Sequence, residues 1–161
     1  MKKLFFVLSL VLFISCSDNS EKITRLQNQI DSIKLGINNT YQSGLGEFMI
    51  NIQIHHAKLW FAGINKNWEL ADFEIQETEE LLEDIQKYQS HREEIKTLPI
   101  IFAPLDSVKS SIKSKNLVKF KQSYTLLTET CNACHEAANN GFNKIKIPDS
   151  PPFSNQIFKP E

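Results

Sequence analysis

Apolar residues recur at steps of three and four positions along most of the chain, which is the spacing of one face of an α-helix. Four stretches carry this pattern, and they cover residues 45–64, 68–88, 104–115 and 116–141. No stretch of any length alternates between apolar and polar residues, as a half-buried strand would. The pattern therefore predicts an all-α fold, in which four amphipathic helices joined by short turns form an antiparallel four-helix bundle over residues 41–141.

The residue types between these stretches indicate where the helices begin and end. Asn67 and Asn116 are well placed to cap the second and fourth helices. Prolines interrupt any single helix in residues 89–104, so the third helix is expected to begin near Pro104. Gly141 is expected to end the fourth helix, because glycine readily adopts the left-handed backbone that stops a helix.

The chain begins with a pattern typical of exported proteins. Residues 1–15 have a positive start, an apolar centre and a small residue before Cys16, which predicts a signal peptide. The stretch that ends at Cys16 resembles a bacterial lipobox, and this resemblance implies that the Cys16 sulfur is lipidated. We therefore expect a lipoprotein held on a membrane outside the bacterial cytoplasm and facing the periplasm. A plain cleaved signal is the alternative.

Residues 16–40 are predicted to form a lipid-attached helical spacer. Its apolar residues step by three and four positions, which is the spacing of a heptad seam; they are Ile23, Leu26, Ile30, Ile33 and Ile37. The seam covers only about two heptads, so a free-standing coiled coil is marginal. Two interpretations stay open: a spacer that leans on its own bundle, and a helix that pairs with a second copy in a homodimer.

Residues 142–161 form a tail of different character. Its prolines force an extended path. The tail also carries apolar residues that are unusual in a free segment, namely Phe142, Phe153, Ile157 and Phe158. We therefore expect this tail to pack back over the end of the bundle.

Composition excludes several classes of protein. The 161 residues include 18 Lys and Arg against 19 Asp and Glu, for a net charge of −1, which argues against a strongly basic nucleic-acid binder. A hydrophobic content of 41% argues against wholesale disorder. Three cysteines are too few for a disulfide scaffold, so each needs its own explanation.

Two of the cysteines belong to the motif that carries chemistry, Cys131-Asn132-Ala133-Cys134-His135. This is CxxCH, the attachment pattern of c-type haem. Two cysteines three residues apart on a helical turn can each form a thioether with one haem vinyl group. The next residue, His135, is then placed to bind the iron as an axial ligand. The motif predicts one covalent haem c.

Other chemistry at CxxCH is less consistent with the rest of the chain. A structural zinc site needs four ligands, and no second Cys/His pair stands nearby in the sequence. A thioredoxin-like redox pair belongs to a βαβ frame, whereas this chain reads as helical. A disulfide between Cys131 and Cys134 would be strained within a helix.

Met49 is the candidate for the opposite axial position on the iron. It is the only methionine outside the signal peptide, and it lies one turn into the first helix of the bundle. In an antiparallel bundle that turn lies beside the end of the last helix, where His135 is expected. A thioether ligand suits an electron carrier. The alternatives are that Met49 only fills space beside the haem, or that a histidine binds the iron.

Histidines and aromatic residues complete the list of candidates. His56 shares the face of Met49 but is about 10 Å deeper along the helix, and His55 points elsewhere. Several aromatic residues could wall the haem or simply form core, and of these Phe48, Phe120 and Tyr124 are expected nearest the haem, with Trp60 and Trp68 further away.

A four-helix bundle with CxxCH near the end of its last helix resembles cytochrome c′, the class II c-type cytochromes. The resemblance covers residues 41–141, and it implies that Cys131 and Cys134 carry the haem and that His135 is the proximal ligand. In low-spin members of the family a methionine early in the first helix is the distal ligand, which matches Met49. In high-spin members an apolar residue occupies that place and the site binds small gases.

The chain also departs from the family pattern. The family usually ends soon after CxxCH, whereas 26 residues follow His135 here, and a spacer precedes the first helix. Three further stretches, residues 56–63, 67–71 and 151–156, are similar to stretches of exported bacterial cytochromes. They support the expected fold and imply nothing more about function.

Together these features predict a non-enzymatic monohaem cytochrome that passes single electrons between redox partner proteins. The main alternative is a five-coordinate haem module that binds NO or CO. A peroxidase would need acid–base residues beside the iron, for which His56 and Lys58 are the only nearby candidates. The expected partners are redox proteins and, through the lipid, a membrane.

Overall fold

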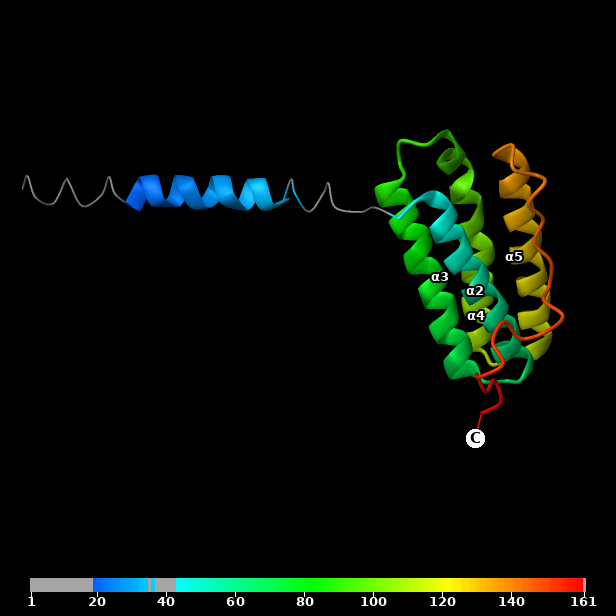
Figure 1. Cartoon of the computed structure of the whole chain (residues 1–161). Helices are drawn as coiled ribbons and strands as arrows, with labels where there is room; N and C mark the ends of the chain where they lie inside the picture. The colour runs from blue at the N-terminus through cyan, green and yellow to red at the C-terminus, as the bar shows by residue number, and fades with distance from the viewer. Residues whose placement is uncertain (1–18, 35, 37–42, 161) are drawn as a thin grey trace, which may run out of the picture. The chain divides into compact units, whose positions relative to one another are not determined.

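The computed structural model describes residues 19–34, 36 and 43–160, in two compact units, Met1–Gln42 and Ser43–Glu161. In the first unit residues 19–34 form a helix, which Figure 1 draws in blue. Four apolar residues of the expected seam are exposed on it: Ile23, Leu26, Ile30 and Ile33. The expected signal peptide, the lipidation candidate Cys16 and the seam residue Ile37 lie outside the described residues.

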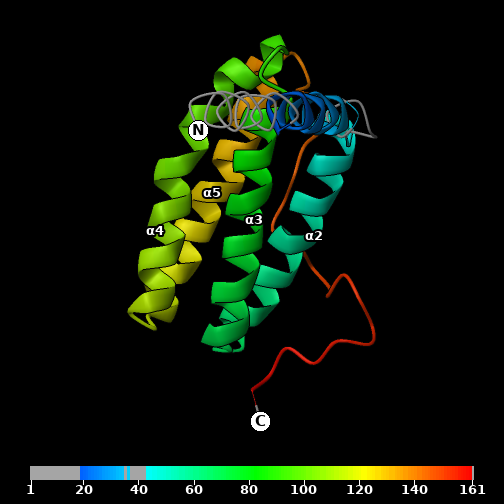
Figure 2. The same ribbon diagram turned by 90° about the vertical axis from the view of Figure 1, so that its left-hand side faces the viewer.

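The second unit is built from helices, and the described residues contain no strand. Its elements are α2 (Leu45–Ile64), α3 (Trp68–Tyr88), the 3₁₀-helix η1 (Glu93–Ile101), α4 (Phe102–Lys113) and α5 (Leu117–Ala137). Consecutive α-helices pack on one another, α5 also contacts α2, and η1 packs mainly on α5. Figures 1 and 2 show the four α-helices side by side. The predicted all-α bundle class is confirmed.

The bounds of α2 and α3 coincide with the predicted stretches, whereas α4 differs slightly from its prediction. This helix begins at Phe102, so Pro104 is its third residue. The N–H groups of the first turn have no intrahelical acceptor, and the missing N–H of Pro104 therefore breaks no hydrogen bond. The interrupted segment before it contains η1, which includes Pro99.

Three helices end at a residue with a left-handed backbone, and two of these ends lead directly into the next helix. The residues are Lys66 (φ 59°), Lys115 (φ 51°) and Asn139 (φ 60°). Their N–H groups and those of the following residues donate back to the last turn, which is the Schellman pattern. Asn67 and Asn116 come next, and their side chains accept hydrogen bonds from the first turns of α3 and α5. Both predicted caps are confirmed.

Gly141 does not end the last helix, so that prediction is wrong. Helix α5 ends at Ala137, and Asn139 takes the left-handed conformation. The N–H of Asn139 donates to Glu136 O (3.1 Å), and the N–H of Asn140 donates to His135 O (2.7 Å). Asparagine enters this conformation more readily than most residues, because its short polar side chain can bond to the local backbone.

Aromatic residues fill the core at the end where α5 begins. The rings of Trp60, Phe120 and Tyr124 lie with centroids 4.9–6.2 Å apart, and Trp68 meets Phe120 edge-on at 6.0 Å. Gly63 faces this cluster, and a Cβ atom there would clash with the Phe120 ring. The close approach of α2 to α5 therefore depends on glycine at that position.

The tail runs back along the side of the bundle rather than over its end, and Figures 1 and 2 both show this path in orange and red. Phe158 is 7% exposed, and its ring centroid lies 5.7 Å from that of Phe61. Near the start of the tail, Ile145 is hydrogen-bonded to Asn132 of α5. The other apolar tail residues that suggested burial are exposed, namely Phe142, Phe153 and Ile157.

Candidate functional site

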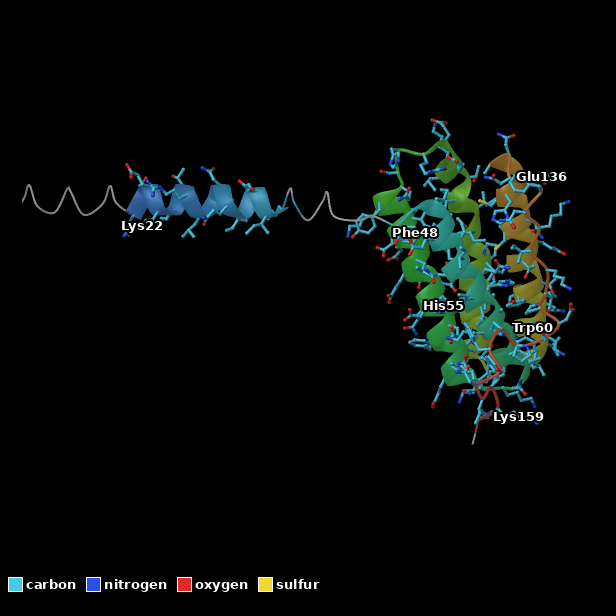
Figure 3. All side chains as sticks on the ribbon, in the orientation of Figure 1. Lys22, Phe48, His55, Trp60, Glu136 and Lys159 are labelled. Carbon is cyan, nitrogen blue, oxygen red and sulfur yellow. The ribbon has the colours of Figure 1, made fainter. Side chains whose placement is uncertain are left out.

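A cavity of about 570 Å³ lies between α2, α3, η1, α5 and the tail, at the end of the bundle where α2 begins and α5 ends. In Figure 3 the labels Phe48 and Glu136 mark this end, and Trp60 lies toward the other. The residues of this cavity that matter for its chemistry are Met49, His56, Arg92, Cys131, Cys134 and His135. Aliphatic side chains supply much of the remaining wall, including Leu82, Ile95, Leu98 and Leu127.

Met49 and the reactive residues of the CxxCH motif therefore border the same cavity, although 82 residues separate Met49 from Cys131. Met49 is partly buried and packs against the core from the first turns of α2. The motif lies in the last turns of α5. The bundle topology thus brings together the four residues that the sequence singled out for haem.

Both cysteines of the motif are free thiols. Burial raises the pKa of the Cys131 thiol to about 12, and the charge of an ionised Cys134 adds a smaller effect in the same direction. A raised pKa keeps Cys131 protonated at neutral pH, whereas a redox-active CxxC pair needs a thiolate. Cys134 is also partly buried, and its sulfur lies 3.1 Å from Thr97 Oγ1 of η1.

The hydrogen bond of His135 fixes which ring nitrogen carries its hydrogen. His135 Nδ1 lies 2.7 Å from the backbone oxygen of Asn143 in the tail. A carbonyl oxygen can only accept, so Nδ1–H is the donor. In the neutral ring, Nε2 then holds a free electron pair, which is the form that binds a metal.

His56 is held differently, because both of its ring nitrogens are engaged inside the core. Nε2 lies 2.9 Å from Thr128 Oγ1, and Nδ1 lies 3.0 Å from the Tyr124 hydroxyl. The Thr128 hydroxyl donates to Tyr124 O, so its oxygen accepts from His56 Nε2–H. Burial lowers the pKa of His56 to about 4. His56 would have to break these bonds to bind a metal.

The other residues suggested for distal chemistry do not line the cavity. His55 Nδ1 lies 2.7 Å from Glu74 Oε2, and Lys58 Nζ lies 2.5 Å from Glu74 Oε1. Glu74 is fully buried in α3 and was not noticed in the sequence. Glu74 follows Ala71 by three residues and precedes Thr78 by four, so helical spacing places it on the buried stripe of α3. Its partners His55 and Lys58 are on α2, so the sequence does not show which residues pair with it.

None of the five aromatic residues considered for the haem wall lines the cavity, and all of them lie in or against the core, which is the other interpretation that the sequence left open. Phe120 and Tyr124 pack with Trp60 in the aromatic cluster, and Phe48 is buried in the core without lining the cavity. Phe120 precedes His135 by fifteen residues of α5, which corresponds to about 22 Å along a helix. The exposed Phe142 of the tail borders the cavity instead.

Sequence reasoning also missed Arg92, the residue that caps η1 and borders the cavity. Its Nη2 donates to Glu94 Oε1 at 2.9 Å, and this bond is the main reason that the pKa of Glu94 is lowered. The Nε atom of Arg92 is buried and has no hydrogen-bond partner among the described residues. Arg92 precedes an irregular segment that contains prolines, and no pattern in the sequence indicates that its side chain would face a cavity.

Comparison of the chain with protein-family models, with curated proteins and with solved structures finds no match. Within the described residues, no three His, Cys, Asp or Glu side chains are grouped so that they could hold a metal ion. None of the helices in the described part of the chain is long and apolar enough to span a bilayer.

Proposed function

We propose that this protein is a monohaem c-type cytochrome that carries single electrons, with the antiparallel four-helix architecture of the cytochrome c′ family. One observation carries the proposal. CxxCH ends a helix at an apolar cavity, with two free cysteine thiols and with the hydrogen of His135 held on Nδ1.

The state of the two cysteines suits covalent attachment. Cys131 and Cys134 would hold the haem as thioethers: each thiol would add across one vinyl double bond, with its sulfur bonding to one carbon and its hydrogen going to the other. This addition needs no oxidant, because no electrons are gained or lost overall. A free Cys131 and a free Cys134 are the form that the reaction requires.

The cavity residues fit a haem group. The volume of about 570 Å³ falls within the range of about 300–1,000 Å³ that is common for cofactor pockets. Aliphatic walls suit the porphyrin, and a haem also carries two propionates that need polar partners. Arg92 is a cation on the cavity wall, and its buried Nε has a hydrogen-bonding capacity that the described residues do not use.

Met49 is the best candidate for the second axial ligand. Of the sulfur and imidazole groups that line the cavity, Cys131 and Cys134 are assigned to the thioethers and His135 to the proximal position. His56 has both nitrogens engaged. The thioether of Met49 is then left, on a different helix from His135.

When bound, haem c supplies an iron that accepts and releases one electron. Two fixed ligands from α2 and α5 would keep the coordination the same in both oxidation states, which favours rapid electron exchange with redox partner proteins. The N-terminal part of the proposal is a lipid on Cys16 that tethers this carrier to a membrane facing the periplasm. Recovery of a Cys16→Ser variant in the soluble fraction tests that tether.

The test of the haem proposal is an absorption spectrum of residues 17–161, produced with a haem-attachment system, in the oxidised and reduced states. We expect a covalently attached, low-spin haem with a far-red band from a methionine–iron bond. Met49→Ala should lose that band and become high-spin. Ile50→Ala is the matched control, because this exposed neighbour on α2 also borders the cavity but offers no ligand atom.

Each other outcome has a distinct meaning. A low-spin spectrum that is unchanged in Met49→Ala would remove Met49 as a ligand. A high-spin spectrum of the unmodified chain that shifts with CO or NO would replace electron transfer by gas binding. Haem that is not covalently attached to the unmodified chain would overturn the cytochrome proposal itself.

A further inference from the structure

We propose that Asn132, the second residue of the CxxCH motif, is a positioning residue that fastens the tail and thereby sets the hydrogen bond of the axial histidine. This inference rests on the proposed cytochrome function and deepens it, because it names the part of the chain that tunes the iron. The tail, which the family resemblance did not account for, becomes part of the haem site.

The attachment of the tail to α5 is made by both atoms of one side-chain amide. Asn132 Nδ2 donates to the backbone oxygen of Ile145 at 2.8 Å, and the backbone N–H of Ile145 donates to Asn132 Oδ1 at 2.7 Å. An asparagine amide offers a donor and an acceptor side by side, so it pairs with the tail backbone as a neighbouring strand would. Neither bond depends on the side chain of residue 145.

The same segment carries the acceptor for the axial histidine. Asn143 lies two residues before Ile145, and its carbonyl oxygen accepts from His135 Nδ1 at 2.7 Å. Asn132 and His135 are three residues apart in α5, and residues at that spacing share a face of a helix. Two residues on one face of α5 therefore contact the tail. Asn132 binds the backbone of Ile145, and His135 donates to the backbone carbonyl of Asn143.

Little else holds the backbone of residues 142–144. Phe142 is 87% exposed, and the side chains of Asn143 and Lys144 are exposed as well. On the helix side this stretch is tied by the hydrogen bonds of Asn140 to His135 O and of Asn143 to Asn140 O. On the other side it is tied by Asn132 at Ile145. Loss of the Asn132 bonds would leave the Asn143 carbonyl free to move away from His135.

The hydrogen bond from His135 Nδ1 to the Asn143 carbonyl would affect how His135 binds the proposed iron. A histidine that donates its second N–H to a fixed carbonyl has a fixed ring orientation and a more basic metal-binding nitrogen. A more electron-rich His135 Nε2 favours the ferric state. Asn132 therefore acts through the Asn143 carbonyl to lower the midpoint potential of the proposed haem.

The experiment compares the holoprotein with three variants. Asn132→Leu removes both amide atoms at similar size, and Asn132→Asp keeps the acceptor for Ile145 N–H but loses the donor. Asn143→Ala is the matched control, because the acceptor for His135 is a backbone oxygen that this substitution leaves in place. We measure the midpoint potential by spectroelectrochemical titration and the exchange of the His135 Nδ1 proton by NMR of the reduced protein.

We expect Asn132→Leu to raise the midpoint potential and to speed exchange of the Nδ1 proton. The exchange rate of Asn132→Asp should lie between those of Asn132→Leu and the unmodified protein. Asn143→Ala should match the unmodified protein in both measurements. Equal potentials and equal exchange in Asn132→Leu and the unmodified protein would overturn the proposal. An Asn143→Ala shift as large as that of Asn132→Leu would overturn it as well. If Asn132→Leu acquires no haem, the exchange rate of the Nδ1 proton in Asn132→Asp decides, and a rate equal to that of the unmodified protein would overturn the proposal.

Failure of the cytochrome proposal can be told apart from failure of this one. If the unmodified chain attaches no haem, the fastening of the tail is still measured in the haem-free protein by trypsin, which cuts after Lys144 and Lys146 on either side of Ile145. We expect cleavage at these two lysines to be several-fold faster in Asn132→Leu than in the unmodified chain and in Asn143→Ala. Equal cleavage rates would show that Asn132 does not fasten the tail.

Discussion

His56 shows how burial decides the role of a single residue. Its side chain lies in the core, with Thr128 and Tyr124 bonded to its two nitrogens. Burial disfavours the charged form, so the pKa falls from 6.5 to about 4. The histidine that the sequence offered as an alternative ligand to Met49 is therefore a neutral part of the core at physiological pH.

The lowered pKa predicts how stability depends on pH. Below about pH 6.5 the unfolded chain binds a proton at His56 that the folded chain does not bind until about pH 4. The free energy of unfolding should therefore fall as the pH drops through this window, by at most about 3 kcal/mol from this group. Denaturant unfolding of the protein between pH 7 and pH 4 measures the effect.

Two variants isolate His56 from the other titrating groups. His56→Gln cannot be protonated, so its deficit in unfolding free energy relative to the unmodified protein should shrink as the pH falls toward 4. His91→Gln, which alters an exposed histidine, controls for the loss of a histidine as such. Parallel curves for His56→Gln would contradict the assignment.

At the scale of the elements, two helices end at a residue type that is uncommon in the left-handed conformation. Lys66 and Lys115 occupy the left-handed positions that end α2 and α4, where glycine is the common residue. A side chain with a Cβ is strained in this conformation by roughly 1–2 kcal/mol. The asparagines that follow cap the next helices, so each turn is held in place by its neighbours in spite of that strain.

Replacing these lysines with glycine should therefore stabilise the protein. We expect Lys66→Gly and Lys115→Gly each to raise the free energy of unfolding by about 0.5–1 kcal/mol, since relief of strain exceeds the extra entropy that glycine gives the unfolded chain. Lys121→Gly, at an exposed position inside α5, should lower it by about 1 kcal/mol. Thermal unfolding of the three variants gives the signs, and a loss of stability in Lys115→Gly would refute the argument.

The elements also show what a sequence can reveal. The bounds of α2 and α3 follow from a regular apolar stripe and from Asn67, because both signals are local. Helix η1 lacks that stripe, since a 3₁₀-helix has a different period and contains Pro99. The same distinction holds for the candidate site. CxxCH and Met49 can be predicted from the sequence, because their side chains carry the chemistry. The acceptor of His135 cannot, because it is a backbone oxygen that any residue at position 143 would supply.

The molecule consists of two units that differ in how far their apolar side chains are buried. The bundle buries its apolar residues within itself, and its core includes Leu59, Ile75, Leu105 and Val108, each fully buried. The helix of residues 19–34 instead presents Ile23, Leu26, Ile30 and Ile33 to solvent, at 45–66% exposure. Their spacing of three, four and three residues is that of a coiled-coil seam, and an isolated helix of this length is marginal in water. A second copy of the same helix would cover the seam.

We therefore expect residues 17–161 to form dimers at high concentration and a chain that begins at residue 43 to stay monomeric. Sedimentation velocity of the two chains over a range of concentrations measures this. Within the longer chain, Ile30→Asp places a charge on the seam and should abolish the dimer. Asn28→Asp adds the same charge two residues away, at an exposed position off the seam, and should preserve the dimer. If both chain lengths sediment as monomers at every concentration, the helix acts as a spacer between the proposed lipid and the bundle, and its apolar seam does not serve self-association.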